Sequence, residues 1–521
     1  MLACLLGTEI LLTSFWFDGA TISAQAGLTG LLAQWGAWVL RWSVGFAGVF
    51  CTFAYLRHQP DLAQLKPDTP IRTVPFVLHF GVFAIFLLLS RQLYWEGVAS
   101  NLAVVSWALA ALGVLLTLLW ALIPWSVFRA TQRITGALWL YSVAAASLAC
   151  ASIPLVRQLW EPATRSTFWL VKTILSTVVS DLIVKPATMH LGTRRFSVII
   201  APSCSGLEGL GLLLIFGVFW LILFRDELRF PRAFLLLPAG MVTLYLANAF
   251  RIAVLVLIGD AGARDIAQRG FHSQAGWIAF NVVAFGLSIG ARRLAWVSNL
   301  PPTSAAVKTD EHPAAPFLMP FLAILAAGML AGAMSGGFEW FYALRVLACT
   351  AVLWFFRRQY RHIDWRGGWL GATVGVAVFV LWMWGATAVP EKAMPAALAA
   401  ASPAATPALA LTWIILRLIG GVVTVPIAEE LAFRGFGLRR LISADFESVP
   451  WQAFTWTSLL ISSVLFGVMH GERWLAGTAA GILYALAMRW RGRLGDAILA
   501  HAVTNGLLAV WVLAFGRWEL W

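Results

Sequence analysis

The sequence predicts an all-α polytopic membrane protein with two helical bundles and about 14 transmembrane helices. Of its 521 residues 60% are hydrophobic and 12% are charged, whereas soluble domains carry about a quarter charged residues. The apolar residues form continuous runs, and about 20 such residues span a bilayer. Because the runs do not alternate with polar residues, a β-barrel is excluded. The composition also excludes a soluble enzyme, a secreted disulfide scaffold and a disordered chain.

The first half contains seven candidate spans, and a helix and a hairpin follow the fourth. The spans are 29–56, 75–90, 101–124, 135–153, 206–224, 233–258 and 277–291. Ser166–Val184 carries its polar residues as one helical stripe, which is typical of an amphipathic helix lying on the membrane surface. Two short apolar runs around Gly192–Arg195 then predict a short hairpin before Cys204.

The second half begins after a Pro-rich segment. We expect domains at 1–298 and 317–521, joined by a cytoplasmic linker at 299–316. Seven further candidate spans lie at 317–335, 338–356, 368–389, 409–425, 452–469, 474–490 and 496–515, with an external loop at 390–408. Glu429 and Glu430 are expected between apolar segments.

The charge pattern predicts the orientation of the first half. The chain carries a net charge of +13, and short basic loops mark the cytoplasmic side. The loops Phe224–Arg232 and Ala291–Arg293 are therefore placed inside, which puts Cys204 at the outer surface. Arg251 then lies about 27 Å along its helix, near the outer edge of the hydrocarbon core. The outer loop Gly259–Gly276 carries His272, so three reactive groups are expected on one face. Met1–Ala20 has no basic start, so no cleaved signal peptide is expected.

The residue types at this face suit acyl transfer. A cysteine nucleophile reacts as a thiolate, which the start of a following helix stabilises, and a nearby His can move the proton. An Arg at membrane depth can stabilise an oxyanion. The non-catalytic alternatives are an unreactive Cys204 thiol, a His272 that is merely solvated, and an Arg251 whose guanidinium extends to the membrane–water interface. The chain has five cysteines, so complete internal pairing is ruled out.

At these residues the sequence resembles the exosortase family. The matching text is SCSGL at 203–207, NAFRI at 248–252, and His272 followed by Gly276 and Trp277. Exosortases are membrane cysteine transpeptidases that recognise a C-terminal signal of motif, transmembrane helix and basic tail on exported proteins. The resemblance implies Cys204 as nucleophile, His272 as general acid and base, and Arg251 as transition-state stabiliser.

A second polar set lies in the distal half. Its members are Glu429, Glu430, Arg434, His470, His501 and Asn505. Glu430 and Arg434 are spaced to pair on one helix face, whereas Glu429 points elsewhere. A carboxylate and a His can activate water, and a His and an Asn can bind an oxyanion. The alternatives are a polar cluster that ties helices together and a zinc site, although HExxH is absent.

This set is similar to the CAAX protease and bacteriocin-processing family. The motifs are EExxxR at 429–434, FxxxH at 466–470 and HxxxN at 501–505. The resemblance implies a glutamate-type intramembrane protease without metal or other cofactor. Glu429 and His470 would activate water, His501 and Asn505 would hold the oxyanion, and Glu430 and Arg434 would support them.

The two resemblances together match the exosortase E/protease fusion subfamily. By that resemblance the protein lies in the bacterial inner membrane, its first site faces the periplasm, and its substrates carry a Val-Pro-Glu-Ile-Asp type sorting motif. The acceptor nucleophile is left open, and no nucleic-acid partner is expected. Two rival classes are a transporter, for which inverted repeats are expected but not seen, and a non-catalytic scaffold or immunity protein.

Overall fold

The computed structural model describes residues 28–62, 64–65, 73–94, 100–299, 312–336, 338–386 and 407–520. Most of the expected linker at 299–316, nearly all of the expected loop at 390–408, and Met1–Ala20 lie outside these residues. Contacts divide the chain into two compact units, Met1–Leu159 and Trp160–Trp521. The domain boundaries expected from the sequence stay a prediction.

The described residues form a multi-pass all-α membrane fold. Seven helices are long and apolar enough to span a bilayer, or eight if the bent pair Trp125–Thr135 and Leu138–Ala151 is one span. Four further apolar helices are shorter, with 10–17 residues. Every span expected from the sequence coincides with a helix. The fold class is therefore confirmed, whereas the count of about 14 spans stays a prediction.

The first unit is built from helices that pair through buried polar side chains. Its elements are α3 (Leu28–Leu62), α4 (Thr73–Tyr94), α5 (Asn101–Leu122), α6 (Trp125–Thr135) and the start of α7 (Leu138–Ser176). Between α4 and α5, His79 Nδ1 lies 3.1 Å from Thr117 Oγ1 and Trp107 Nε1 donates to Ser90 Oγ at 2.8 Å. These bonds satisfy groups that a bilayer cannot solvate.

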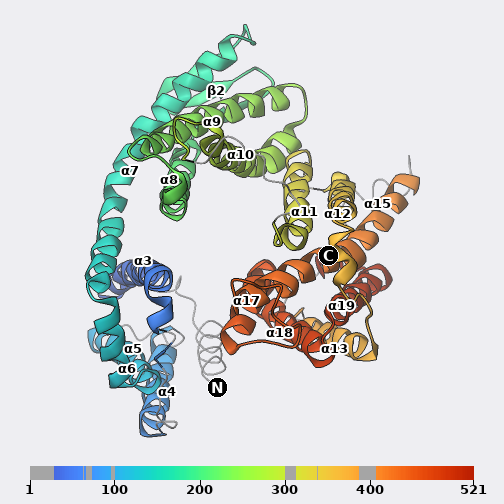
Figure 1. Ribbon diagram of the computed structural model, residues 1–521. Coiled ribbons are helices and arrows are strands. Elements are labelled where there is room, and N and C mark those ends of the chain that lie inside the picture. The colour runs from blue at the N-terminus through green and yellow to red at the C-terminus, as the bar shows by residue number, and fades with distance from the viewer. Residues whose placement is uncertain are drawn as a thin grey trace. The chain divides into compact units, whose positions relative to one another are not determined.

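The amphipathic segment that begins at Ser166 is the last part of α7 and not a separate surface helix (Figure 1). In the charged stretch before it, Arg165 and Glu161 pair one turn apart at 2.6 Å, which favours the helix slightly. Its buried face, with Phe168, Val171 and Leu175, packs in one cluster with residues of the sheet and α9.

A small antiparallel sheet follows α7. Its strands are β1 (Ile183–Lys185), β2 (His190–Gly192) and β3 (Ser197–Ile199), in the order β1-β2-β3. The expected hairpin is β2–β3, where Gly192 pairs with Ser197, and β1 adds a strand that the sequence did not indicate.

Three helices complete the first half. They are α8 (Leu207–Leu223), α9 (Leu236–Asp260) and α10 (His272–Arg293), and a π-helical turn at Ile266–Phe271 precedes α10. Leu213, Leu244 and Val283 form a shared core, one residue from each helix. These three helices therefore hold the segments of Cys204, Arg251 and His272 against one another.

The second half is a bundle around one interrupted helix. Its helices are α11 (Ala315–Ala333), α12 (Ala343–Phe355), α13 (Trp369–Ala386), α15 (Pro407–Ile419), α16 (Val425–Glu430), α17 (Trp456–Val468), α18 (Trp474–Arg491) and α19 (Leu494–Phe515). π-helical turns at Gly420–Thr424 and Leu431–Leu438 flank α16, so Ala408–Leu438 runs as one helical segment.

The apolar stretches on either side of Glu429 and Glu430 belong to one continuous helical segment. Both carboxylates sit within the helical segment Ala408–Leu438, where the rest of the bundle buries Glu430 completely. Glu430 is compensated there because it pairs with Arg434 inside the same helical segment.

Candidate active sites

Cys204 lies in a tight turn directly before α8. The turn Pro202–Cys204 is a 3-10 helix, and Gly206 then takes a φ of 84° before the helix begins at Leu207. A Cβ on Gly206 would lie 2.9 Å from Asn248 Nδ2, so both the backbone angle and the close neighbour require glycine. The half-buried thiol therefore sits at the amino end of α8.

Helix α9 holds the other two segments through side chains one turn apart. Asn248 Nδ2 donates to the carbonyl of Cys204 at 3.0 Å. Arg251 Nη1 donates to the carbonyl of His272 at 3.5 Å. A Cβ on Gly276 would come within 3.0 Å of the same Nη1, so a glycine one turn into α10 makes room for the guanidinium.

The thiol and the imidazole face one cavity. Cys204 and His272 both line a cavity of about 320 Å³, and Arg251 lines a neighbouring cavity of about 200 Å³. Ser203 lines both. His272 is the first residue of α10, and not part of a loop as the sequence suggested. The Nε of Arg251 is buried and finds no hydrogen-bond acceptor among the described residues.

In the second site, Glu430 and Arg434 form a fully buried ion pair. Arg434 Nη1 lies 3.1 Å from Glu430 Oε1, and their side chains are 1% and 0% exposed. Arg434 Nη2 also donates to the carbonyl of Gly481 at 2.9 Å, and its guanidinium lies 4.2 Å from the ring centre of Phe466. The expected pairing is present, and it fixes the helical segment against α17 and α18.

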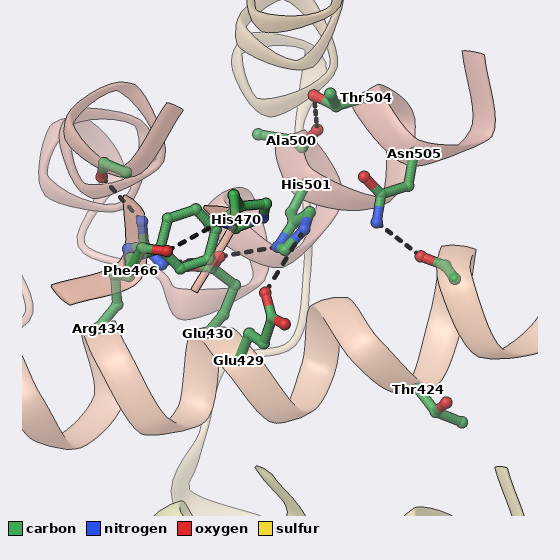
Figure 2. Close-up of polar contacts among 12 residues, drawn as sticks. Thr424, Glu429, Glu430, Arg434, Phe466, His470, Ala500, His501, Thr504 and Asn505 are labelled. Atoms are coloured by element: carbon green, nitrogen blue, oxygen red, sulfur yellow. Dashed lines mark hydrogen bonds and ion pairs between the residues drawn. The ribbon is translucent and has the colours of Figure 1, made fainter. Parts of the chain in front are cut away.

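His501 lies between the two adjacent carboxylates (Figure 2). Its Nδ1 is 3.0 Å from Glu430 Oε1 and its Nε2 is 3.9 Å from Glu429 Oε2. Because Glu430 Oε1 also accepts from Arg434, Nδ1 of His501 is assigned as the donor of this contact. Glu429 is therefore the carboxylate that is accessible from the cavity. Its contact with His501 is longer than that of Glu430, and its side chain is 16% exposed.

His470 has a defined tautomer. Its Nδ1 lies 2.9 Å from the carbonyl of Phe466, and a carbonyl can only accept, so Nδ1 bears the proton. Nε2 of the neutral ring is therefore the basic atom. Burial lowers the pKa of His470 below its ordinary 6.5, against the opposing effect of this hydrogen bond. The ring is thus neutral at pH 7.

Asn505 lies one turn after His501 on α19. Its Nδ2 donates to the carbonyl of Gly421 at 2.7 Å (Figure 2), inside the π-helical turn, and one N–H remains for another acceptor. All four predicted catalytic side chains line one cavity of about 420 Å³: Glu429, His470, His501 and Asn505.

The sequence did not lead us to two aromatic residues that contact the histidines of the second site. Tyr484 stacks on His501 with ring centres 4.9 Å apart, and Trp382 lies 5.5 Å from His470. Tyr484 is 2% exposed, and a Tyr inside an apolar run is a signal that could have drawn attention, because a buried hydroxyl needs a partner. Nothing in the sequence indicates Trp382.

The zinc alternative finds no ligand set in the part of the chain that the structure describes. No group of three or more His, Cys, Asp or Glu side chains there could hold a metal ion.

Two family models match this chain. Residues 35–289 match the transmembrane exosortase family, and residues 411–507 match the family of type II CAAX prenyl endopeptidases of the Rce1-like kind. The searches of curated proteins and of solved structures found no match. The two matched segments contain every candidate catalytic residue of the respective sites.

Proposed function

We propose that this chain, which joins an exosortase segment to a Rce1-like CAAX protease segment, carries two different peptidase sites in one multi-pass membrane protein. Both families imply peptidase activity on protein substrates in the membrane. The finer assignment is a cysteine transpeptidase around Cys204 and a glutamate-type endopeptidase around Glu429.

The first reaction is acyl transfer from a peptide bond to an acceptor. His272 takes the proton of the Cys204 thiol, and the thiolate attacks the peptide carbonyl. Arg251 stabilises the oxyanion. Collapse breaks the C–N bond, His272 protonates the leaving amine, and an acceptor nucleophile then releases the acyl group from the thioester. The observation that carries this proposal is the shared cavity of Cys204 and His272, beside an Arg251 bonded to the His272 carbonyl.

The substrate assignment rests on the exosortase resemblance and on the charge pattern. The substrates are exported proteins with a C-terminal motif, a transmembrane helix and a basic tail, with a motif of the Val-Pro-Glu-Ile-Asp type. The enzyme lies in a bacterial inner membrane, and Cys204 faces the periplasm.

The second reaction is hydrolysis without a covalent intermediate. Glu429 and the basic Nε2 of His470 draw a proton from water, which adds to the peptide carbonyl. Asn505 donates to the oxyanion through its free N–H, and His501 does so through Nε2 when both of its ring nitrogens carry a proton. The C–N bond then breaks, and the proton taken from water passes to the leaving amine. Glu430 and Arg434 act as positioning residues, because their ion pair orients the imidazole of His501. No metal or other cofactor takes part in this assignment.

The decisive experiment replaces the proposed nucleophile in the full chain. A reporter protein with the C-terminal signal is co-expressed, and release of the signal is followed by immunoblot and mass spectrometry. Cys204→Ala is expected to abolish release, whereas Cys51→Ala, which removes an exposed thiol, leaves it unchanged. Continued release by Cys204→Ala would rule out the transpeptidase assignment.

A labelling experiment tests the orientation. In a variant that retains Cys204 as its only cysteine, a membrane-impermeant thiol reagent is expected to label spheroplasts from the periplasmic side. Labelling only in inverted vesicles would reverse the topology.

A further inference from the structure

The small sheet has a free edge close to the thiol of Cys204. The strand order β1-β2-β3 gives β3 a partner strand on one side only, within the described residues. Four residues separate Ile199, the last residue of β3, from Cys204. A strand edge without a partner presents main-chain N–H and C=O groups that can pair with another extended chain. The edge of β3 is therefore a possible binding site beside the nucleophile.

The register of the sheet shows which main-chain groups face this edge. The N–H of Ile200 donates to the carbonyl of Met189 at 2.9 Å, and the N–H of Thr193 donates to the carbonyl of Phe196 at 2.8 Å. In an antiparallel ladder every second residue bonds to the same neighbour. The N–H and C=O of Ile199 therefore point away from β2. Within the described part of the chain, neither group bonds to a residue outside the sheet.

The cavity shared by Cys204 and His272 runs along the same edge. Four consecutive residues, 198–201, line it together with the thiol and the imidazole. Ala201 continues the extended conformation, with φ −75° and ψ 162°. Side chains of a strand alternate between its two faces, so a cavity on one face would meet only every second residue. Contact with consecutive residues places the cavity at the edge of β3.

The edge is held in place by contacts with α9. Phe196, next to β3, is 6% exposed and packs in one cluster with Leu255. A Cβ on Gly259 would come within 2.3 Å of its ring, so this glycine makes room for it. Thr193, in the turn of the hairpin, donates to the carboxylate of Asp260. A preformed edge binds a ligand at a lower entropic cost than a mobile one.

The walls of the cavity favour main-chain recognition. None of the described residues that line it is Asp, Glu, Lys or Arg. The wall contributed by α9 consists of Ile252 and Leu255, which are both 4% exposed. Such walls contact apolar side chains but cannot pair with a charged one. In β-strand addition, main-chain hydrogen bonds supply the affinity and pockets read every second side chain.

We propose that the peptide substrate of the Cys204 site binds as a fourth strand on the free edge of β3. One residue of the peptide exchanges two main-chain hydrogen bonds with Ile199, and the chain then passes the thiol. The occupant is the substrate because the edge and the nucleophile line one cavity. This inference rests on the proposed transpeptidase function and describes how that site holds its substrate.

A disulfide scan locates the added strand without cleavage. The full chain carries Ile199→Cys as its only cysteine, since all five native cysteines, Cys204 included, are replaced by alanine. A reporter with the C-terminal signal carries one cysteine at successive positions before its transmembrane helix. Directly paired residues have Cα atoms about 5.5 Å apart, which suits a disulfide. We expect one position to cross-link about tenfold more than either neighbour, because adjacent side chains point to the opposite face.

Val184→Cys in the same background is the matched control. Val184 takes the corresponding outward position on β1, at the other edge of the sheet, and does not line the cavity. Equal cross-linking from both edges, or an even yield along the reporter, would overturn the proposal. A disulfide-linked dimer through Ile199→Cys, in place of the mixed product, would assign the edge to a second copy of the chain and overturn the substrate assignment.

Proline variants test the same bonds through signal release. Ile199→Pro removes the N–H that faces the free edge and leaves the bonds to β2, which an edge strand tolerates. We expect release to slow about tenfold, because the main-chain bonds to the peptide are lost. Ile199→Val keeps the N–H, and Val184→Pro makes the same change at the other edge. Both are expected to stay within about twofold of the unsubstituted chain.

The reactivity of Cys204 towards a small thiol reagent reports whether the site is still assembled. It is expected to be equal in the three variants, since the reagent does not need the strand edge. Unchanged release by an Ile199→Pro chain with normal thiol reactivity would overturn the proposal. If its thiol reactivity is altered, the disulfide scan alone decides.

The two experiments separate this proposal from the function on which it rests. A single cross-linking maximum at Ile199→Cys, without signal release by the unsubstituted chain, would contradict the transpeptidase function alone. Cys204-dependent release without such a maximum would contradict the added strand alone. The absence of both would contradict both.

Discussion

Asn248 and Arg251 give the first site its geometry through main-chain contacts. Each donates to the backbone carbonyl of a proposed catalytic residue, Asn248 to Cys204 and Arg251 to His272. Because the two donors lie one turn apart on α9, this helix holds both carbonyls. In the proposed mechanism Arg251 has two tasks, to position His272 and to stabilise charge with its remaining donors.

Arg251→Lys separates charge from geometry. Lysine keeps the positive charge but lacks the planar set of N–H donors, so we expect the rate of signal release to fall about 100-fold. The measurement is a time course of release from the reporter in membranes. Arg269→Lys is the matched control, since Arg269 is an exposed arginine near His272 whose ion pair with Asp265 is long, at 3.6 Å. An equal loss in both variants would speak against a specific role of Arg251.

The second activity is expected to fall in acid. Burial lowers the pKa of His470 below 6.5, so the basic Nε2 is present at pH 7 and disappears as the pH drops through that lowered value. Folding stability has the same sign, because the unfolded state binds the proton first as the pH falls. A pH profile of Glu429-dependent cleavage in the Cys204→Ala chain checks this. A midpoint of the activity loss above pH 6.5 would contradict the assigned role of His470.

At the scale of elements, α8 depends on the glycine before its first turn. Gly206→Ala places a Cβ at a φ of 84°, which costs about 1–2 kcal/mol, and brings it against Asn248. We therefore expect a lower thermal unfolding temperature in detergent and reduced signal release.

Gly211→Ala is the control for that substitution. Gly211 lies inside the same helix, and a Cβ there meets nothing within 4 Å. Alanine favours the helix by up to about 1 kcal/mol, so stability is expected to stay equal or rise. Equal destabilisation in both variants would show that α8 tolerates no Cβ at all, and the special role of Gly206 would be lost.

The helical segment Ala408–Leu438 carries the second site between two π-helical turns. A π turn widens the helix and frees backbone groups locally. The carbonyl of Gly421 in the first turn accepts from Asn505, and the second turn contains Arg434, the partner of Glu430. The irregular turns therefore connect the carboxylates to α19 and to the buried ion pair.

At the scale of the molecule, the two sites share no lining residue. None of the residues around the Glu429 cavity lines either cavity of the first site. Independent sites without shared partners behave additively. We expect Glu429→Gln to leave signal release within about twofold of the unsubstituted chain and Cys204→Ala to spare the second cleavage.

The measurement compares both activities in the two single variants and the double variant. Full loss of signal release in Glu429→Gln would refute independence and would place the two cleavages in series on one substrate.

Most of the helices could be predicted from the sequence, and the wrong predictions have local causes. The continuous apolar runs predicted spans that all coincide with helices, because a bilayer requires about 20 apolar residues in a row. The polar stripe from Ser166 suggested a separate helix on the membrane surface, whereas this segment is the last part of α7. His272 was expected in a loop, whereas it begins α10 after a π-helical turn. Local polarity does not show whether a helix continues through a polar stretch.

The sequence by itself determined the membrane fold class, the motifs of both sites and the residues offered for chemistry, since span length and residue type are local properties. Only the tertiary structure decided which carbonyls Asn248 and Arg251 bind, that His501 lies between two carboxylates, and that β3 and α9 line one cavity with Cys204. These are contacts between segments far apart in the chain. They depend on how the helices pack, and no local pattern of residues encodes that packing.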